Sequence, residues 1–285
     1  MSRYDEHPVV FDCHGTELVG IVATQKSPGL HHIGVVILVG GPQYRVGSHR
    51  QFTLLCRQLA EDGIASFRFD YHGLGDSDGP PALGVDGVEN DLRAAIDAFT
   101  LAVPTISGVV LWGLCGAASA SALYAPADVR VKGLVMLNPW VRTEEGLAKA
   151  HLRHYYLGRL GDRNFWGRIA RGEVAVAAAL RAFGTSVVKA GGWGRGGHSE
   201  SGSLPERMLA SLLRTGLPTL VVLSGDADLT ANEFRQVAGG STAWRQWMAS
   251  DSVECHEVEG SDHTFSRTDW CDRVAELTTR WVRAR

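Results

Sequence analysis

Residues 111–119 read LWGLCGAAS. The apolar residues that come first predict the end of a buried strand, and the small residues that follow Cys115 predict the start of a helix. A nucleophilic residue between small residues at such a junction is typical of a nucleophile elbow, a strained turn that projects the side chain above the sheet. The nucleophile here is a cysteine, and the positive end of the helix dipole favours its thiolate form.

Strand and helix patterns alternate on both sides of this junction. Continuous apolar runs predict buried strands, and apolar residues at helical spacing predict amphipathic helices. We expect a hairpin over 9–24, strands at 33–39, 64–71, 108–112, 131–137, 217–223 and 252–258, and helices at 48–62, 86–100, 116–124 and 270–281. The alternation predicts one α/β domain with a mainly parallel, doubly wound sheet.

Residues 140–214 interrupt this alternation. The segment is long, mostly helical in pattern, and contains the glycine-rich run GGWGRGG at 191–197. We therefore expect a helical lid at 140–214, inserted between two parts of one core at 1–139 and 215–285. The alternative is a small helical subdomain without a gating role.

Composition and charge exclude several classes of protein. The chain has 285 residues, of which 45% are apolar, so it can bury a sizeable core. Its net charge of -3 argues against a nucleic-acid partner. No apolar run is long enough to span a bilayer, and the five cysteines include no CxxC pair, which indicates neither a disulfide framework nor a zinc site. We expect a cytoplasmic protein without metal or cofactor, and its oligomeric state stays open.

Two further polar groups follow later expected strands. SGDAD at 224–228 contains two aspartates, and His263 lies in the loop after the next strand. Open α/β sheets hold their functional sites at the carboxyl ends of their strands. The chain order of nucleophile, acid and histidine matches the arrangement of α/β hydrolases.

The order of these residues predicts their roles. We expect Cys115 to attack an acyl carbonyl, and His263 to take and return protons. Asp228 is expected to orient the imidazole, in preference to Asp226, because its spacing from Gly225 is usual for this acid.

An oxyanion formed in this attack needs backbone N–H donors. The amide of Gly116, directly after the nucleophile, is one expected donor. The loop after the first central strand should supply the other, and since Pro42 has no N–H, Gln43 is the expected residue. Gly40 and Gly41 either let this backbone approach the substrate or simply end the strand.

The side chains expected to bind the substrate lie in that loop and in the helical segment. They are Tyr44, Trp140, Arg142, His154 and Tyr155. Aromatic residues in a small helical insert more often pack against one another, and this alternative stays open.

Two other features are expected to be structural. FDYHGLGDSDG at 69–79 lacks the spacing of a dinucleotide-binding loop, and no lysine follows as in a phosphate-binding loop, so it predicts a turn. Cys13, Cys56 and Cys255 fall within strand or helix patterns and are expected in the core.

Five stretches of this sequence, taken together, carry a resemblance to a known family. They are GGPQYRVGSHRQF at 40–52, GLCGAAS at 113–119, NPWVRTE at 138–144, DLTANEF at 228–234 and DHTFS at 262–266. They resemble hydrolase 1 of the exosortase A-associated α/β hydrolases, over nearly the whole chain. The resemblance implies an α/β-hydrolase fold, a cytoplasmic enzyme, and a triad of Cys115, Asp228 and His263. Gly116 departs from the family pattern, in which we expect an acidic residue.

Together these patterns predict a hydrolase that acts on an ester or thioester through an S-acyl-enzyme intermediate. The expected partner is a small-molecule acyl substrate, free or bound to a carrier as a thioester. One alternative is an acyltransferase that uses the same triad. Another is a hydrolase-like scaffold that binds without turnover, in which cysteine replaced serine as activity was lost.

Overall fold

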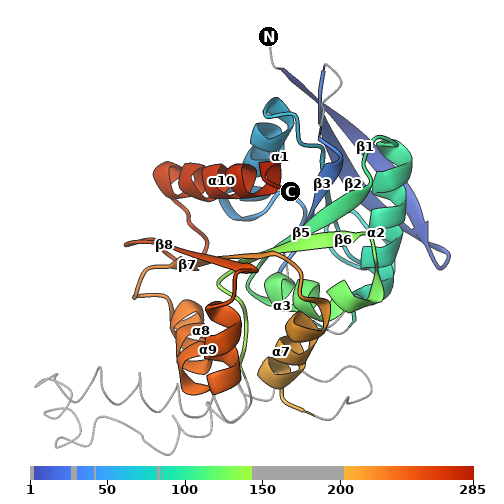
Figure 1. Ribbon diagram of the computed structural model, residues 1–285. Coiled ribbons are helices and arrows are strands. Elements are labelled where there is room, and N and C mark those ends of the chain that lie inside the picture. Colours follow the sequence, from blue (N-terminus) through green and yellow to red (C-terminus); the bar gives the residue numbers. More distant parts are fainter. Residues whose placement is uncertain (1–2, 27–30, 42, 82–83, 86, 143–201) are drawn as a thin grey trace, which may run out of the picture.

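The computed structural model describes the chain except residues 1–2, 27–30, 42, 82–83, 86 and 143–201. Eight strands form one sheet in the order β1-β2-β4-β3-β5-β6-β7-β8 (Figure 1). β1 and β2 pair antiparallel, as do β2 and β4, and the remaining strands run parallel. The bounds are β1 (Tyr4–Cys13), β2 (Thr16–Gln25), β3 (Ile33–Leu38), β4 (Ser66–Phe69), β5 (Gly108–Leu114), β6 (Val131–Leu137), β7 (Thr219–Ser224) and β8 (Val253–Val258).

Helices cover both faces of this sheet, so the mainly parallel, doubly wound architecture is confirmed. In Figure 1, α1 and α10 lie together on one face, and α3, α7, α8 and α9 lie on the other. The α-helices are α1 (Gln51–Glu61), α2 (Glu89–Ala102), α3 (Gly116–Tyr124), α7 (Leu204–Thr215), α8 (Leu229–Gly240), α9 (Thr242–Met248) and α10 (Thr268–Arg283), and Ser48–Arg50 and Ala125–Ala127 form short 3-10 helices.

The central strands are buried on both faces, which explains their unbroken apolar sequences. All seven residues of β5 are buried. Trp112 of β5 packs edge-on against Phe52 of α1, with ring centroids 5.5 Å apart. Its indole N–H donates to the hydroxyl of Thr278 in α10 at 3.3 Å. One side chain thus ties the central strand to both helices of its face.

The structure differs from the expected elements mainly toward the carboxyl end. α7, α8 and α9 were not predicted as separate helices. α7 begins with a capping box in which Ser203 and Glu206 bond reciprocally, a signal that is present in the sequence. It packs against α3 and buries Met208 and Leu212. Most of the expected lid, residues 143–201, lies outside the described residues.

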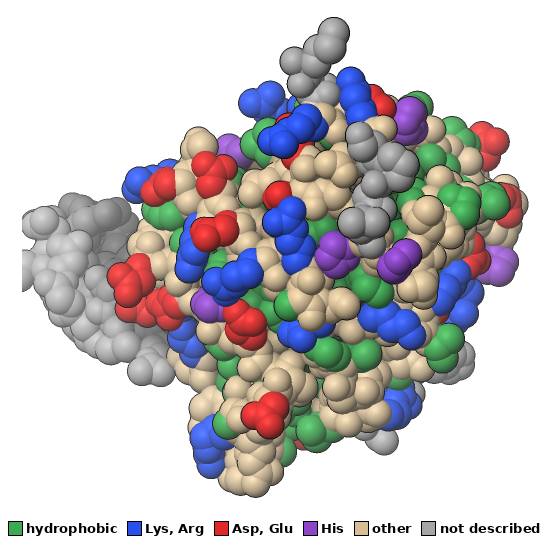
Figure 2. All heavy atoms as spheres, turned by 45° about the horizontal axis from the view of Figure 1, so that its top comes forward, with side chains coloured by type: hydrophobic (Ala, Val, Ile, Leu, Met, Phe, Trp, Pro, Cys, Tyr) green, Lys and Arg blue, Asp and Glu red, His purple; other side chains and the backbone are tan. Residues whose placement is uncertain are grey.

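The surface mixes charges of both signs. Figure 2 shows acidic and basic side chains interspersed over the face that it presents. Two ion pairs of this kind fix α10, one between Arg280 and Glu254 and one between Arg283 and Asp62, each at 2.9 Å. In the part of the chain that the structure describes, no helix is both long and apolar enough to cross a bilayer.

Candidate active site

Cys115 is the single residue between β5 and α3. Its backbone angles, φ 60° and ψ -122°, fall in a region that a residue with a Cβ rarely adopts. The turn holds because the Cys115 amide donates to the Leu137 carbonyl at 2.8 Å. A Cβ on Gly113 would lie 2.5 Å from the backbone of Ala117, so only glycine lets strand and helix approach this closely. The half-buried Cys115 side chain therefore stands on a sharp strand-to-helix turn.

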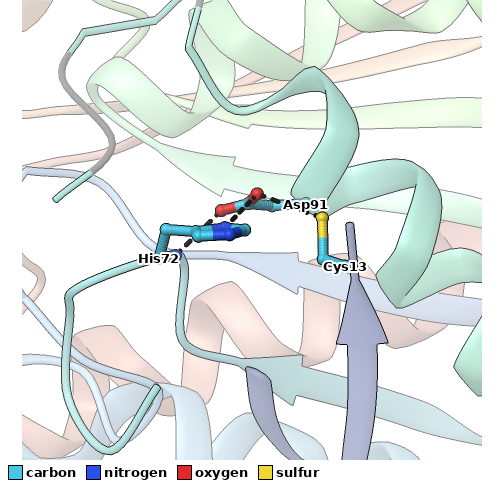
Figure 3. Close-up of side chains that lie close together, drawn as sticks. All are labelled: Cys13, His72 and Asp91. Atoms are coloured by element: carbon cyan, nitrogen blue, oxygen red, sulfur yellow. Dashed lines mark hydrogen bonds and ion pairs between the residues drawn. The ribbon is translucent and has the colours of Figure 1, made fainter. Parts of the chain in front are cut away.

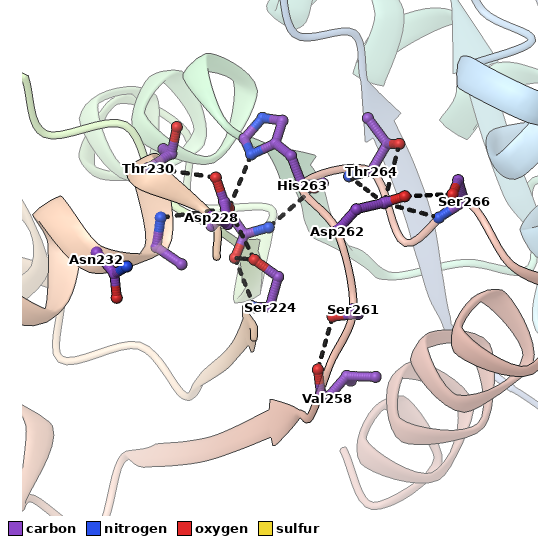
Figure 4. Close-up of polar contacts among 12 residues, drawn as sticks. Ser224, Asp228, Thr230, Asn232, Val258, Ser261, Asp262, His263, Thr264 and Ser266 are labelled. Atoms are coloured by element: carbon purple, nitrogen blue, oxygen red, sulfur yellow. Dashed lines mark hydrogen bonds and ion pairs between the residues drawn. The ribbon is translucent and has the colours of Figure 1, made fainter. Parts of the chain in front are cut away.

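His263 and Asp228 come from the loops after β8 and β7. The Nδ1 atom of His263 lies 3.0 Å from a carboxylate oxygen of Asp228. Figure 4 shows the two side chains pointing toward each other. A carboxylate can only accept, so Nδ1 carries a proton. Cys115 lies close enough to the same imidazole to affect its pKa. Asp226 is exposed. Of the two aspartates, the structure brings Asp228 to the imidazole.

Asp228 is held by several donors besides His263. It is the N-cap of α8 and accepts the amide of Thr230 at 3.0 Å. It also accepts the hydroxyl of Ser224 at 2.7 Å. Burial alone raises the pKa of this carboxyl, but the hydrogen bonds from His263, Ser224 and Thr230 outweigh burial and lower the pKa below its usual value. Asp228 is therefore a carboxylate at neutral pH.

The imidazole of His263 is strongly basic in this setting. Burial by itself lowers its pKa. The hydrogen bonds and negative charges of Asp228 and Cys115 outweigh burial and raise the pKa of His263 to about 10. His263 therefore carries a proton at neutral pH.

The loop that bears His263 is fixed by its neighbour Asp262. The Asp262 carboxylate accepts the amides of Thr264 at 3.1 Å and Ser266 at 3.0 Å (Figure 4). Such bonds from an aspartate to amides further along the chain stabilise a tight turn. The position of the imidazole is thus set by the backbone as well as by Asp228.

Asn138 is a site residue that sequence reasoning missed. It follows β6 directly, is fully buried and has a positive φ of 42°. Its side-chain oxygen accepts the amide of Ser224 at 2.8 Å, and its side-chain N–H donates to the carbonyl of His263 at 2.9 Å. Asn138 therefore links the loops that carry Asp228 and His263. A polar residue directly after a buried strand was the available signal, and the same signal marks Ser224.

The loop after β3 lies against the elbow. A Cβ on Gly40 would lie 2.5 Å from the carbonyl oxygen of Leu114, so the missing side chain lets this loop lie close to the elbow. The amide of Gly116 begins α3 and has no acceptor within the helix, which leaves it available to an oxyanion. The amide of Gln43 donates to the carbonyl of Gly41 at 2.9 Å. In this conformation the expected second donor to the oxyanion is therefore already hydrogen-bonded within its own loop.

Arg45 anchors the far end of that loop. Its amide donates to the buried carboxylate of Asp70 at 2.6 Å, and its guanidinium pairs with both Asp70 and Asp76. A Cβ on Gly75 would collide with Asp70, since it would lie 2.2 Å from a carboxylate oxygen. The stretch expected as a structural turn thus holds the loop beside the elbow.

The expected substrate-binding residues are placed differently from one another. The Trp140 amide donates to the carbonyl of Cys115 at 3.3 Å, which places Trp140 beside the elbow. Arg142 lies 4.4 Å over the Trp140 ring and pairs with Glu233 of α8 at 2.9 Å. Tyr44 is 48% exposed. The two remaining expected residues, His154 and Tyr155, lie outside the described residues.

A second group of cysteine, histidine and aspartate lies at the end of β1 (Figure 3). Asp91 of α2 accepts the ring N–H of His72 at 2.6 Å and the thiol of Cys13 at 3.6 Å. Burial, followed by the charge of Asp91, raises the pKa of Cys13 to about 11, so the thiol stays protonated at neutral pH. The three residues come from distant segments, and sequence spacing did not predict their meeting.

This second group fits a hydrogen-bond network better than a metal site. The ligand atoms lie within 4.8 Å of one another. Two ligands on one zinc ion stand about 3.3 Å apart, whereas the nitrogen of His72 and the oxygen of Asp91 are 2.6 Å apart and share a proton. The network ties the β1 end to α2.

The strand order and the positions of Cys115, Asp228 and His263 after β5, β7 and β8 define an α/β-hydrolase fold. Comparisons with known proteins agree with this class. Residues 31–163 match the family model described as serine aminopeptidase, S33. A comparison with curated proteins finds no match.

Solved structures share the fold over nearly the whole chain. A hypothetical protein from Pseudomonas aeruginosa aligns with TM-score 0.62 and 18% identity, over 98% of this chain and 94% of its own. An esterase from Pyrococcus furiosus aligns with TM-score 0.62 and 17% identity, over 98% and 94%. A serine hydrolase without lid from Xanthomonas campestris aligns with TM-score 0.57 and 16% identity, over 98% and 94%. At these identities the likeness establishes the fold.

Proposed function

We propose that this protein is an ester or thioester hydrolase that works through an S-acyl intermediate on Cys115. The observation that carries the proposal is a thiol on a strained elbow, close to an imidazole that a buried carboxylate orients. The match to the serine aminopeptidase model and the fold shared with a Pyrococcus furiosus esterase support a hydrolase. The motif resemblance to exosortase A-associated hydrolase 1 supports a role for Cys115 as the nucleophile.

The first half of the reaction uses Cys115 as a thiolate and His263 as an imidazolium. The Cys115 thiolate forms a bond to the acyl carbon, and the Gly116 amide stabilises the resulting oxyanion. The carbon–oxygen or carbon–sulfur bond to the leaving group then breaks, and His263 donates its proton to that group. The products of this half are a neutral thioester on Cys115, a neutral imidazole, and the free alcohol or thiol.

Acylation of Cys115 leaves His263 able to act as a base in the second half of the reaction. The thiolate charge is one cause of the raised pKa of His263, and this cause disappears when the sulfur is acylated. The imidazole, now neutral, takes a proton from water while the water oxygen attacks the thioester. The carbon–sulfur bond breaks, the acid leaves, and the thiolate and imidazolium are restored. An alcohol, amine or thiol in place of water would make the enzyme an acyltransferase.

Intact-mass measurement tests the proposal directly. Incubation with short acyl thioesters should add one acyl group to wild type and to His263→Gln, more slowly in the variant, and none to Cys115→Ala. Acylation that survives Cys115→Ala contradicts the assignment, and a wild type that takes up no acyl group supports the binding scaffold instead. Adding acceptor amines or thiols and measuring acyl transfer against acid release separates transferase from hydrolase.

A further inference from the structure

The segment directly after β6 is fastened to the elbow through the backbone of Trp140. The Trp140 amide donates to the carbonyl of Cys115 at 3.3 Å. The Trp140 carbonyl in turn accepts the hydroxyl of Ser119 at 2.5 Å, and Ser119 is a fully buried residue of α3. Both backbone polar groups of Trp140 therefore bond to the turn and the helix that hold the nucleophile.

Arg142 connects the same segment to helix α8. Its Nε atom donates to both carboxylate oxygens of Glu233, at 2.9 and 3.1 Å. The centre of its guanidinium lies 4.4 Å from the centre of the Trp140 ring, within the range of a cation–π contact. The Arg142 and Glu233 side chains are 15% and 12% exposed, so solvent screens their attraction less than it screens a surface ion pair.

Helix α8 carries the acid of the candidate triad. Asp228 is its N-cap and accepts the amides of Thr230 at 3.0 Å and Ala231 at 3.4 Å. Glu233 lies five residues further on, about one and a half turns into the helix. Because the intervening residues are helical, a shift of Glu233 shifts Asp228 with it.

These contacts form a continuous connection between two members of the candidate triad. It runs from the Cys115 carbonyl through Trp140 and Arg142 to Glu233, and along α8 to Asp228. Cys115 follows β5 and Asp228 follows β7, and β6, which leads into the connecting segment, lies between these two strands in the sheet. The connection therefore spans the gap between the nucleophile and the acid.

From this geometry we infer that Arg142 and Glu233 are a positioning pair, which holds Asp228 at the distance from the Cys115 elbow that the proposed reaction needs. The catalytic part of this inference rests on the proposed function. Neither side chain touches a reacting atom, and the pair acts through Asp228, which orients His263. Since a displacement of about 1 Å can lower a rate roughly 100-fold, a pair that fixes this distance controls kcat. The substrate-binding role expected for Arg142 from the sequence would act on KM instead.

Three variants separate positioning from stability: Arg142→Gln, Glu233→Gln and the two combined. Each single variant leaves one mostly buried charge without its partner, which lowers the melting temperature. The double variant leaves no such charge and should melt closer to wild type. The connection is broken in all three, so kcat for a short acyl thioester should fall roughly tenfold in each, with KM within about twofold of wild type.

Alkylation of Cys115 by iodoacetamide gives a second readout that needs no substrate. Its rate, followed by peptide mass over a series of pH values, reports how strongly a nearby imidazolium favours the thiolate. In the double variant this rate should fall roughly tenfold at pH 7, because Asp228 no longer holds the imidazole of His263 at the same distance from the thiol.

Arg57→Gln is the matched control for Arg142→Gln. Arg57 of α1 also bonds a glutamate, Glu6 of β1, at 2.7 and 2.9 Å, and lies 5.7 Å over the aromatic ring of Tyr4. This variant should keep the kcat of wild type and its rate of Cys115 alkylation.

Three results would overturn the inference. They are a kcat that recovers together with the melting temperature in the double variant, variants that change KM alone, and alkylation of Cys115 at the wild-type rate in the double variant. If wild type hydrolyses no thioester while the variants still slow the alkylation of Cys115, the proposed function fails and the positioning pair stands.

Discussion

The hydroxyl of Ser224 offers a sharp test of how the candidate site is held. It donates to Asp228 at 2.7 Å, and a hydrogen bond to a buried carboxylate contributes about 1.5–3 kcal/mol. Ser224→Ala deletes this bond and leaves no new unpaired group, since the Ser224 amide still donates to Asn138. We therefore expect the free energy of unfolding to fall by about 2 kcal/mol at pH 7.

The same substitution should leave a signature in the pH dependence. The hydrogen bond from Ser224 is one cause of the lowered pKa of Asp228, so its stabilisation is present above the unfolded pKa and is lost as pH falls through the folded pKa. The difference between wild type and Ser224→Ala should shrink as the solution is acidified. Urea unfolding at a series of pH values measures it. We also expect kcat to fall roughly tenfold with little change in KM, because Asp228 orients the imidazole less tightly.

Ser261→Ala is the matched control for this prediction. Its hydroxyl is equally buried and donates at 2.7 Å, but to the neutral carbonyl of Val258. Its removal should lower stability by about 1 kcal/mol at every pH, without an effect on kcat. Equal losses in the two variants, or a loss in Ser224→Ala that does not depend on pH, would refute the reasoning.

Two further predictions concern the histidine and the loop beside the elbow. The pKa of His263 is raised to about 10, so the stability that its charged form contributes is fully present below about pH 6.5 and is lost as pH rises through about 10. In urea unfolding, the stability advantage of wild type over His263→Gln should therefore be larger at pH 6 than above pH 10. An advantage that does not change with pH contradicts an ion pair between His263 and Asp228. Gly40→Ala places a Cβ 2.5 Å from the Leu114 carbonyl oxygen, so it should destabilise the protein by about 1–3 kcal/mol and reduce the rate of acylation of Cys115. If the variant keeps the stability and the acylation rate of wild type, the loop accommodates the methyl group and the prediction is wrong.

Local sequence determined much of the framework. α3 and β6 lie at the predicted residues 116–124 and 131–137, and the central strands were recognised from their unbroken apolar runs. Periodicity and turn chemistry arise between residues that are close along the chain, so one sequence is enough to recognise them. The elbow at Cys115 was predictable for the same reason, because glycine and small residues around a nucleophile are a local pattern.

Only the tertiary structure decided which distant polar groups meet. Asn138 follows β6, Ser224 is the last residue of β7, and His263 follows β8. Asn138 hydrogen-bonds the other two because the sheet order places β6, β7 and β8 side by side. The group of Cys13 with His72 and the pair of Arg142 with Glu233 likewise depend on packing between segments far apart in the chain. Sequence spacing carries no record of such contacts, since each depends on the register and burial of the whole sheet.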